Sequence, residues 1–538
     1  MGYSKIAVSV LALGCLAVPA TGLWAQSLTK LPVVKAGLRS KARITPCNTR
    51  RAASGTEQLA SYDQGCHSFA RTLARNIALM NFNAALPQLE PGGRIALTGP
   101  QNHVPVLTPG FWSHVFHNFW LGGQINVITQ GNGHFYAKYS GPQSFENYPN
   151  VNATSMQDFY SGARITRNFE ILFDVEDIRG DGLSSTFGIA GFPDLDAQRA
   201  PTPGTTAAHT YMSRFLLHYV VPLGDGMVKH GPDYLSLASS LPERRFQIYF
   251  GKFSLADFFD RNAYANNDHN GFMNWTADQN GAWDMSGSIT NFTYGGLAEF
   301  DDGNWKFRYA EVLESRNPNG RYLDLRIGNN KSGNAQISWG YSPATHGKVR
   351  LLGYVNEAGM GSFADALAAY HKGITHTPSI LAVREIGTHE YGYGLNWQQG
   401  LPRNFGLFSR IGWNNGKYEN YSFTEVNNTI TGGVQIPGAL WKMPSDHAGV
   451  AFISNGISTE HQKYLAAGGI GFILGDGGLT YGREQIFETY YNLKLPAVFS
   501  FAPDFQYVRN PGYNQVRGPV AIFGMRMHIH FGFHLVPL

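Results

Sequence analysis

Residues 253–284 combine aromatic rings with carboxylates, amides and an arginine, and they contain few aliphatic side chains that could build a core. Aromatic rings stack on the apolar faces of sugars, while carboxylate, amide and guanidinium groups exchange hydrogen bonds with hydroxyls. This segment is therefore a candidate sugar-binding loop. A solvated loop whose rings pack against a neighbouring wall is the alternative, and residue types alone do not decide between the two. The side chains expected in or near the binding site are Asp257, Asp260, Arg261, Trp275, Trp283 and Asp284, with Arg308 facing them from a later strand.

Two pairs of carboxylates raise the question of glycoside hydrolysis, because that reaction uses two carboxyl groups beside the scissile bond. Asp257 and Asp260 stand three residues apart in this loop, where binding to water or arginine is the simpler expectation. Glu484 and Glu488 stand four residues apart on one strand, so they share a face and point into the same space. We expect no enzymatic activity from either pair.

Metal and cofactor chemistry have little support in the sequence. His528 and His530 share one strand face, but two ligands without a third donor make a weak metal site. No glycine-rich phosphate loop and no nucleophile elbow stand out in the chain. We therefore expect neither a metal nor a cofactor.

The segment that carries these histidines alternates between apolar and polar residues. Successive side chains of a strand point to opposite sides. A strand in a soluble core would not carry basic groups on its second face, and a soluble edge strand seldom exposes so apolar a stripe. The pattern is typical of a wall between lipid and water, as in a transmembrane β-barrel. One face presents Ala521, Phe523, Met525, Met527, Ile529 and Phe531, and the other presents Arg526, His528 and His530.

The same two-residue period recurs from about Phe116 onward, with short and long connections between the segments. We predict an all-β chain that forms a transmembrane antiparallel β-barrel over residues 113–531, with about 16 strands and 18 as the alternative. The expected strands lie near residues 118–130, 156–165, 169–176, 209–221, 245–250, 288–300, 305–309, 334–341, 349–356, 390–398, 404–413, 430–437, 446–454, 487–494, 496–508 and 521–531.

The N-terminus indicates export. Lys5 precedes the apolar stretch Ile6–Val18, and small residues follow up to Ala25. This is the layout of a secretory signal peptide, so we expect removal of residues 1–25, with lipidation of Cys15 as the alternative. No later run reaches the ~18 apolar residues that a spanning helix needs. An exported chain that enters a membrane must then do so as a closed barrel.

Residues 26–112 differ from the rest of the chain. Residues 58–80 are expected to be mostly helical, and residues 84–110 are rich in Pro and Gly. We expect a small N-terminal periplasmic segment, helical and irregular, and a cover over one barrel mouth is the equal alternative. Its two cysteines, Cys47 and Cys66, most simply form a disulfide in an exported protein, with free thiols as the alternative.

Composition agrees with a barrel and excludes one class of partner. Charged residues make up 15% of the chain and aromatic residues 13%, with 63 glycines, which suits strands with aromatic girdles and tight turns. A formal net charge of +4 over 538 residues is too small to indicate binding to nucleic acid.

Several motifs resemble one family, the carbohydrate-selective porins of Gram-negative outer membranes. Residues 251–284 resemble the constriction-loop region of that family, and the C-terminal third is closer still. The resemblance covers roughly residues 116–531 and is thinnest between 370 and 450. The C-terminal motifs are Ser454-Asn455-Gly456-Ile457-Ser458, Tyr464-Leu465-Ala466-Ala467-Gly468-Gly469-Ile470-Gly471-Phe472, Leu474-Gly475-Asp476-Gly477, Glu488-Thr489-Tyr490-Tyr491, and Asn510-Pro511-Gly512-Tyr513-Asn514 with Arg517-Gly518-Pro519.

The resemblance implies an outer-membrane porin that passes carbohydrates by diffusion through a barrel narrowed by an inward loop. It also implies outer-membrane lipid and the barrel assembly machinery as partners, and leaves monomer and homo-oligomer open. The chain departs from the family at its end, because residues 532–538 follow the terminal aromatic Phe531 that the machinery reads. The alternative function is a secreted or surface all-β protein that binds or cleaves carbohydrate without a pore.

Replacing Ile529 by Arg is expected to block assembly, because a charge on the lipid face near mid-bilayer costs ~2–4 kcal/mol. Replacing His528 by Ala, on the opposite face, should leave the barrel intact. The shift of gel mobility on boiling reports the assembled barrel. Equal tolerance at the two positions would contradict the barrel assignment of this strand.

Mass spectrometry of the non-reduced mature protein is expected to show the peptides of Cys47 and Cys66 linked to each other. Alkylation of both thiols without prior reduction would refute the disulfide. The barrel should assemble in either case, because neither cysteine lies in an expected strand.

Overall fold

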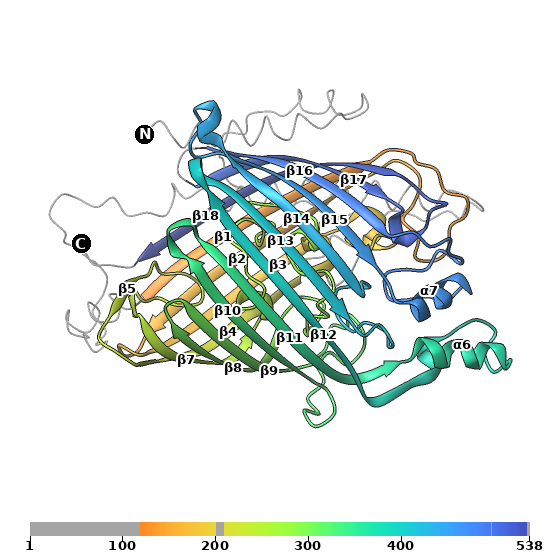
Figure 1. Cartoon of the computed structure of the whole chain (residues 1–538), viewed down its shortest axis with the longest axis horizontal. Helices are drawn as coiled ribbons and strands as arrows, with labels where there is room; N and C mark the ends of the chain where they lie inside the picture. Colours follow the sequence, from red (N-terminus) through yellow and green to blue (C-terminus); the bar gives the residue numbers. More distant parts are fainter. Residues whose placement is uncertain (1–118, 201–208, 496–497, 535–538) are drawn as a thin grey trace, which may run out of the picture. The chain divides into compact units, whose positions relative to one another are not determined.

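The structure is a computed structural model, and it describes residues 119–200, 209–495 and 498–534. The expected signal peptide, the segment 26–112 and the pair Cys47 and Cys66 lie outside these residues. Sixteen strands pair in antiparallel fashion into one closed barrel (Figure 1). They are β1 (Phe119–Asn132), β2 (Asn150–Arg164), β3 (Phe169–Gly180), β4 (His209–Pro222), β7 (Arg244–Phe253), β8 (Thr293–Asp302), β9 (Trp305–Leu313), β10 (Lys331–Ser342), β11 (Gly347–Gly361), β12 (Arg384–Leu401), β13 (Phe405–Asn414), β14 (Asn428–Pro437), β15 (His447–Gly456), β16 (Glu484–Lys494), β17 (Phe499–Arg509) and β18 (Val520–His534).

The barrel closes between its first and last strands. β1 pairs with β18 in an unbroken register from Trp120 opposite His534 to Asn132 opposite Ile522. Closure removes the open sheet edges that a bilayer does not tolerate. The predicted barrel and its count of sixteen are confirmed, and every expected segment overlaps a strand. The last strand runs past Phe531 to His534, so residues 532–534 continue the barrel wall.

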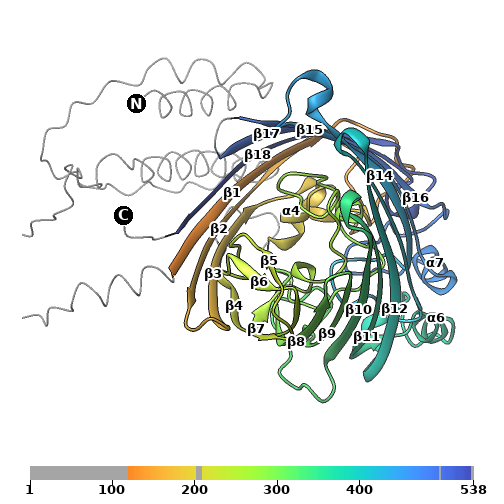
Figure 2. The same cartoon turned by 60° about the vertical axis from the view of Figure 1, so that its left-hand side comes forward.

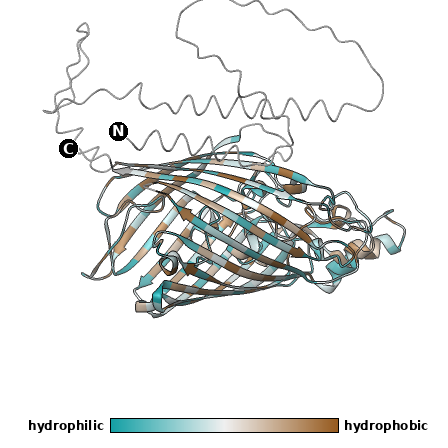
Figure 3. Cartoon of the chain, turned by 90° about the horizontal axis from the view of Figure 1, so that it is seen from above, coloured by the Kyte–Doolittle hydropathy of each residue, from teal (hydrophilic) through white to brown (hydrophobic). Residues whose placement is uncertain are grey.

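The barrel wall has polar side chains on its inner face and apolar side chains on its outer face, the opposite of a soluble protein. In β3, Glu170, Asp174 and Glu176 face the interior and are at most 3% exposed, whereas Phe173 faces outward and is 40% exposed. Figure 3 shows hydrophilic and hydrophobic residues alternating along the strands. An apolar outer surface over a polar lumen is the signature of a barrel that sits in lipid.

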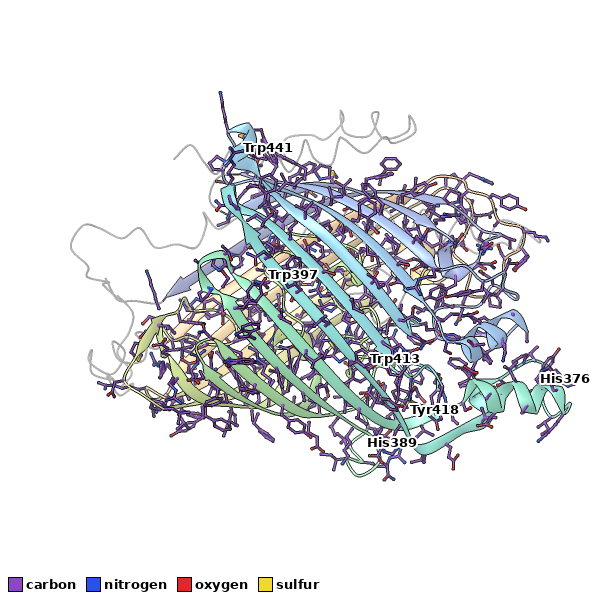
Figure 4. The ribbon with its side chains drawn as sticks, viewed as in Figure 1. His376, His389, Trp397, Trp413, Tyr418 and Trp441 are labelled. Carbon is purple, nitrogen blue, oxygen red and sulfur yellow. The ribbon has the colours of Figure 1, made fainter. Side chains whose placement is uncertain are left out.

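Large aromatic side chains gather at both ends of this outer surface. Trp305 and Trp339 stack with ring centroids 5.7 Å apart, near the short turns. Trp441 lies at the turn between β14 and β15, and Trp413 lies toward the opposite end of the barrel, where it contacts Tyr393 (Figure 4). Two such belts mark the two interfaces between lipid and water.

The connections differ between the two ends. One end has short turns such as residues 303–304 and 402–404, with one longer connection that carries the hairpin β5 (Met227–Lys229) and β6 (Ser240–Pro242). The other end has eight long loops, among them 181–208 and 254–292. The helices α6 (Phe363–His371) and α7 (Thr459–Ala466) project from that end (Figure 1). This asymmetry is that of an outer-membrane barrel.

The remaining helices lie in loops inside the barrel (Figure 2). They are α4 (Leu195–Arg199) in the β3–β4 loop and α5 (Trp275–Asp278) in the β7–β8 loop. In the part of the chain that the structure describes, no helix has both the length and the apolar character to cross a bilayer. Single 3-10 turns stand at Leu183–Thr186, Leu255–Asp257, Pro343–Thr345, Ile380–Val383, Pro402–Asn404, Gly438–Trp441 and Pro511–Tyr513.

The inward loops build a core of their own within the lumen. Phe192 from the β3–β4 loop and Phe259, Trp275 and Trp283 from the β7–β8 loop are fully buried in one hydrophobic cluster. The loops therefore fill one side of the barrel and leave an open space on the other.

Candidate functional site

The β7–β8 loop, residues 254–292, is fastened to the barrel wall by Arg410 of β13. Its guanidinium donates to the Asp260 carboxylate at 2.8 Å and to the carbonyl oxygens of Ala265 and Ala277 at 2.6 and 3.0 Å. Arg410 and Asp260 are both almost completely buried. A single side chain from the wall thus holds three points of the loop. The carboxylate of Asp260 balances its positive charge.

Two glutamates of β16 hold further backbone of the inward loops. The Glu488 carboxylate accepts hydrogen bonds from the backbone N–H groups of Met273 and Asn274, at 2.6 and 3.3 Å. The Glu484 carboxylate accepts from Ala190 and Gly191 of the β3–β4 loop, at 3.0 and 2.7 Å. These are the two carboxylates that share a strand face. Both are engaged in anchoring backbone.

The end of the loop is fastened on the opposite wall. The Asp284 carboxylate accepts from the backbone N–H groups of Tyr421 and Ser422, at 2.8 and 2.6 Å. The indole N–H of Trp283 donates to the side chain of Asn334 at 3.0 Å. The loop is therefore tied to β10, β13, β16 and the 415–427 loop.

Beside the loop lies a cavity of about 490 Å³, bounded by β1–β4 and β16–β18. Its lining mixes charged, amide and aromatic side chains. The side chains available to a solute include Gln124, Asp158, Tyr160, Glu176, Arg199, Arg214, Tyr234, Asp257, Arg261, His269, Phe292, Lys494, His528 and His530.

Arg214 is the centre of this lining. Its guanidinium donates two hydrogen bonds to the Asp257 carboxylate, at 2.8 and 2.7 Å, and one to Asp174 at 3.1 Å. The same group lies over the ring of Tyr234, 4.4 Å from the centroid. Such a cation–π contact and a bidentate carboxylate fix the plane of the guanidinium.

A β-bulge lies beside Arg214 in β4. The pairing of β3 with β4 shifts between Asp174 and Val175, which leaves Ser213 as an extra residue opposite them. Ser213 and Arg214 are consecutive in the chain and both buried. The bulge re-aims the residues before it, so that Tyr211 lies opposite Glu176 and its hydroxyl donates to that carboxylate. Arg214 shares the inward face with Leu216 and His218.

Arg199 reaches the same cavity from α4 of the β3–β4 loop. It pairs with Glu176 of β3 and lies 5.7 Å from the ring centroid of Phe292. The helix is held in place because the Asp194 carboxylate caps it at the Ala197 N–H and accepts from the Thr154 hydroxyl at 2.9 Å. The β3–β4 and β7–β8 loops and the strands β3 and β4 thus bring guanidinium groups, carboxylates and aromatic rings together at the cavity.

Comparison with known proteins accords with this arrangement. The carbohydrate-selective porin, OprB family, matches residues 144–531, which is well over half of the chain. The chain belongs to the carbohydrate-selective porin family. It is an outer-membrane channel of a Gram-negative bacterium, as the closed barrel, its outward apolar surface and its loop asymmetry require.

One solved structure, that of Pseudomonas putida OprB, shares the fold of this porin. The high-pH structure of Pseudomonas putida OprB is 14% identical, with a TM-score of 0.58 over 77% of this chain and 94% of that one. The outer membrane channel DcaP of Acinetobacter baumannii is 9% identical, with a TM-score of 0.41 over 77% of this chain and 97% of that one. No curated protein matched in a sequence search.

The charges that line the porin's cavity nearly balance. Five carboxylates face four arginine and lysine side chains. The anionic groups are Asp158, Glu176, Asp257, Asp268 and Asp278, and the cationic groups are Arg199, Arg214, Arg261 and Lys494. Two pairs form within this set, Arg199 with Glu176 and Arg214 with Asp257. The cavity therefore offers many hydrogen-bonding groups with little net charge.

The predicted site residues fall into two groups. Asp257 and Arg261 line the cavity of the porin. The other five lie in the anchorage of the loop: Asp260 binds Arg410, Asp284 binds backbone of the 415–427 loop, and Arg308 donates to the Phe258 carbonyl at 2.5 Å. Trp275 and Trp283 are fully buried, so their rings are covered by the loop core.

Sequence reasoning missed Arg199, Arg214 and Tyr234. Arg214 sits in an expected strand on the same face as His218, and that shared polar face is the signal that could have found it. Arg199 and Tyr234 belong to connections without periodicity. Asp257 and Asp260 do bind arginines, as their spacing in the loop led us to expect.

Replacing Arg410 by Met is expected to release the β7–β8 loop from the wall, because removal of one partner leaves Asp260 as an uncompensated buried charge, a cost of ~3–5 kcal/mol. Single-channel recordings in salt should then show higher and noisier conductance, and limited proteolysis should cut the loop. The heat-dependent gel shift should persist.

Replacing Arg245 by Met is the matched control. Arg245 is also a buried lumen arginine paired with a carboxylate, but its partners are Asp301 of β8 and the carbonyl oxygen of Pro242, away from the loop. If both variants conducted equally, the anchoring role of Arg410 would be wrong.

Proposed function

We propose that the cavity between the β7–β8 loop and the walls of β2–β4 is the filter of the porin, where a neutral sugar binds in passing. The observation that carries this proposal is the stacking of Arg214 over Tyr234 while its N–H groups are held by Asp257. Ring faces and fixed polar groups side by side suit a sugar, which has both apolar faces and hydroxyl edges.

The near balance of charge favours neutral solutes in this proposal. A cavity with one dominant sign would concentrate ions of the opposite sign. Paired guanidinium and carboxylate groups instead offer donors and acceptors to hydroxyls without a strong net field. Binding must stay weak, because a site that holds its solute tightly does not pass it on.

The predicted residues take two roles in the proposal. Asp257 and Arg261 meet the sugar directly, since both line the cavity. Asp260, Trp275, Trp283, Asp284 and Arg308 position the loop, because they contact the wall or are buried within the loop core.

The proposal extends to catalysis and to partners. We infer that the porin has no catalytic activity, and the engagement of Glu484 and Glu488 with backbone N–H groups supports a positioning role for both.

The apolar outer face supports insertion by the barrel assembly machinery into outer-membrane lipid. Monomer and homo-oligomer are both consistent with this surface.

Replacing Arg261 by Gln tests the filter with little risk to the fold, because Arg261 is exposed toward the cavity. The sugar concentration that half-blocks ion current in a planar bilayer should rise about tenfold, since a hydrogen bond to a charged group contributes ~1.5–3 kcal/mol. The reversal potential in a salt gradient should also shift in the direction of greater cation selectivity, because the variant lacks the positive charge of Arg261.

Replacing Arg244 by Gln is the control, because Arg244 is exposed near the short turns and pairs with Asp302 outside the cavity. It should leave sugar block unchanged. A shifted reversal potential without any change in sugar block at Arg261 would show that the cavity filters ions and not sugars.

A further inference from the structure

Asp196, Asp268 and His269 bring three ligand atoms together where the two inward loops meet. Asp196 belongs to α4 of the β3–β4 loop, and the other two belong to the β7–β8 loop. The carboxylate and imidazole atoms lie within 4.8 Å of one another. All three side chains are more than nine-tenths buried.

The imidazole of His269 is oriented by a partner behind it. Its Nδ1 lies 3.1 Å from the Oε1 atom of Gln124 on β1. An amide oxygen only accepts hydrogen bonds, so Nδ1 carries the proton and Nε2 points at the carboxylates. Asp196 is also supported from behind, because its Oδ2 atom accepts from the Asn126 side chain at 2.8 Å. Metal-binding histidines and carboxylates are typically held by such partners.

The spacing fits a shared cation better than direct contact. His269 Nε2 lies 3.6 Å from Asp196 Oδ1 and 3.6 Å from Asp268 Oδ1. An N–H···O hydrogen bond spans about 2.7–3.2 Å, whereas two ligands that each lie about 2.0–2.1 Å from one tetrahedral ion stand roughly 3.4 Å apart. Among the described residues, Asp196 Oδ1, Asp268 Oδ2 and His269 Nε2 have no hydrogen-bond partner.

Two arginines approach the cluster. Arg526 of β18 donates to the backbone carbonyl oxygens of Asp268 and Gly271, at 2.6 and 2.8 Å. Arg199 lies 3.6 Å from Asp196 Oδ1, but its closer partner is Glu176. Neither arginine forms an ion pair with the Asp268 carboxylate, so a cation bound between the two aspartates would compensate its charge.

We propose that Asp196, Asp268 and His269 bind a divalent transition-metal ion of the Zn²⁺ class, which ties the β3–β4 loop to the β7–β8 loop. One imidazole and two carboxylates suit Zn²⁺, whereas Ca²⁺ takes six to eight oxygen ligands. Asp268 and His269 also line the cavity, so the cluster lies at the edge of the channel.

The two loops already contact each other, since Phe192 stacks on Trp275 and the Asn274 side chain donates to the Gly191 carbonyl at 2.7 Å. The ion adds a further link between them and so holds the constriction narrow.

Conductance of the purified full-length porin in a planar bilayer tests this proposal, with EDTA-washed protein titrated with ZnCl₂. We expect a saturable fall in single-channel conductance, reversed by EDTA and absent with MgCl₂. Isothermal titration should give one Zn²⁺ per chain. Loss of a group that only supports a metal ligand from behind lowers metal affinity about 10–100-fold. Asp196 and His269 are direct ligands in this proposal, so Asp196→Asn and His269→Gln should each weaken Zn²⁺ binding at least tenfold.

His530→Gln is the matched control, because His530 lines the same cavity but lies outside the cluster. It should respond to ZnCl₂ as the unaltered porin does. No heat of binding up to millimolar ZnCl₂, or an undiminished response in Asp196→Asn with a normal heat-dependent gel shift, would overturn the proposal. Sugar block in the absence of metal is a separate readout, so failure of the zinc site leaves the proposed sugar filter standing.

Discussion

A polar loop that crosses the lumen must satisfy its backbone groups away from bulk water, and this porin meets that need with side chains of the barrel wall. Arg410 donates to three points of the β7–β8 loop, and Glu488 accepts from two of its backbone N–H groups. Unpaired buried polar groups cost ~1–3 kcal/mol each. The position of the loop therefore depends on these contacts, and the cavity exists because the loop is held to one side.

The anchors and the filter use the same chemistry in different surroundings. Arg410 is fully enclosed, so its charge serves only to hold Asp260 and nearby carbonyl oxygens. Arg214 is likewise bound to carboxylates and lies against the rings of Tyr234 and Phe292, but it also lines the cavity. A guanidinium that is fixed by one partner keeps its geometry while it meets a passing solute, because little rotamer freedom is left to lose.

Two separate hydrophobic environments stabilise the molecule. The outer face contacts lipid through side chains such as Phe307 and Ile529, while the inner loops bury Phe192, Phe259 and Trp275 in a core that lipid never reaches. The barrel wall between them is polar on its inner side. Changes in the loop core should therefore alter conductance and leave the barrel assembled. Changes on the lipid face should instead impair assembly of the barrel.

The sequence by itself determined the barrel, because an alternating strand records in each residue which side faces lipid. Ile529 and His528 are adjacent in the sequence, but Ile529 faces lipid and His528 faces the lumen. The alternation within this one strand is enough to record that difference. The strand count and the inward loop also followed from the pattern and from the resemblance to the porin family. Only the tertiary structure decided which side chains meet at the cavity. Arg214 meets Asp257 and Tyr234 from two separate connections, and Trp275 is covered by Phe192 from 83 residues earlier in the chain. Such contacts depend on how loops pack against one another, and no local period records that.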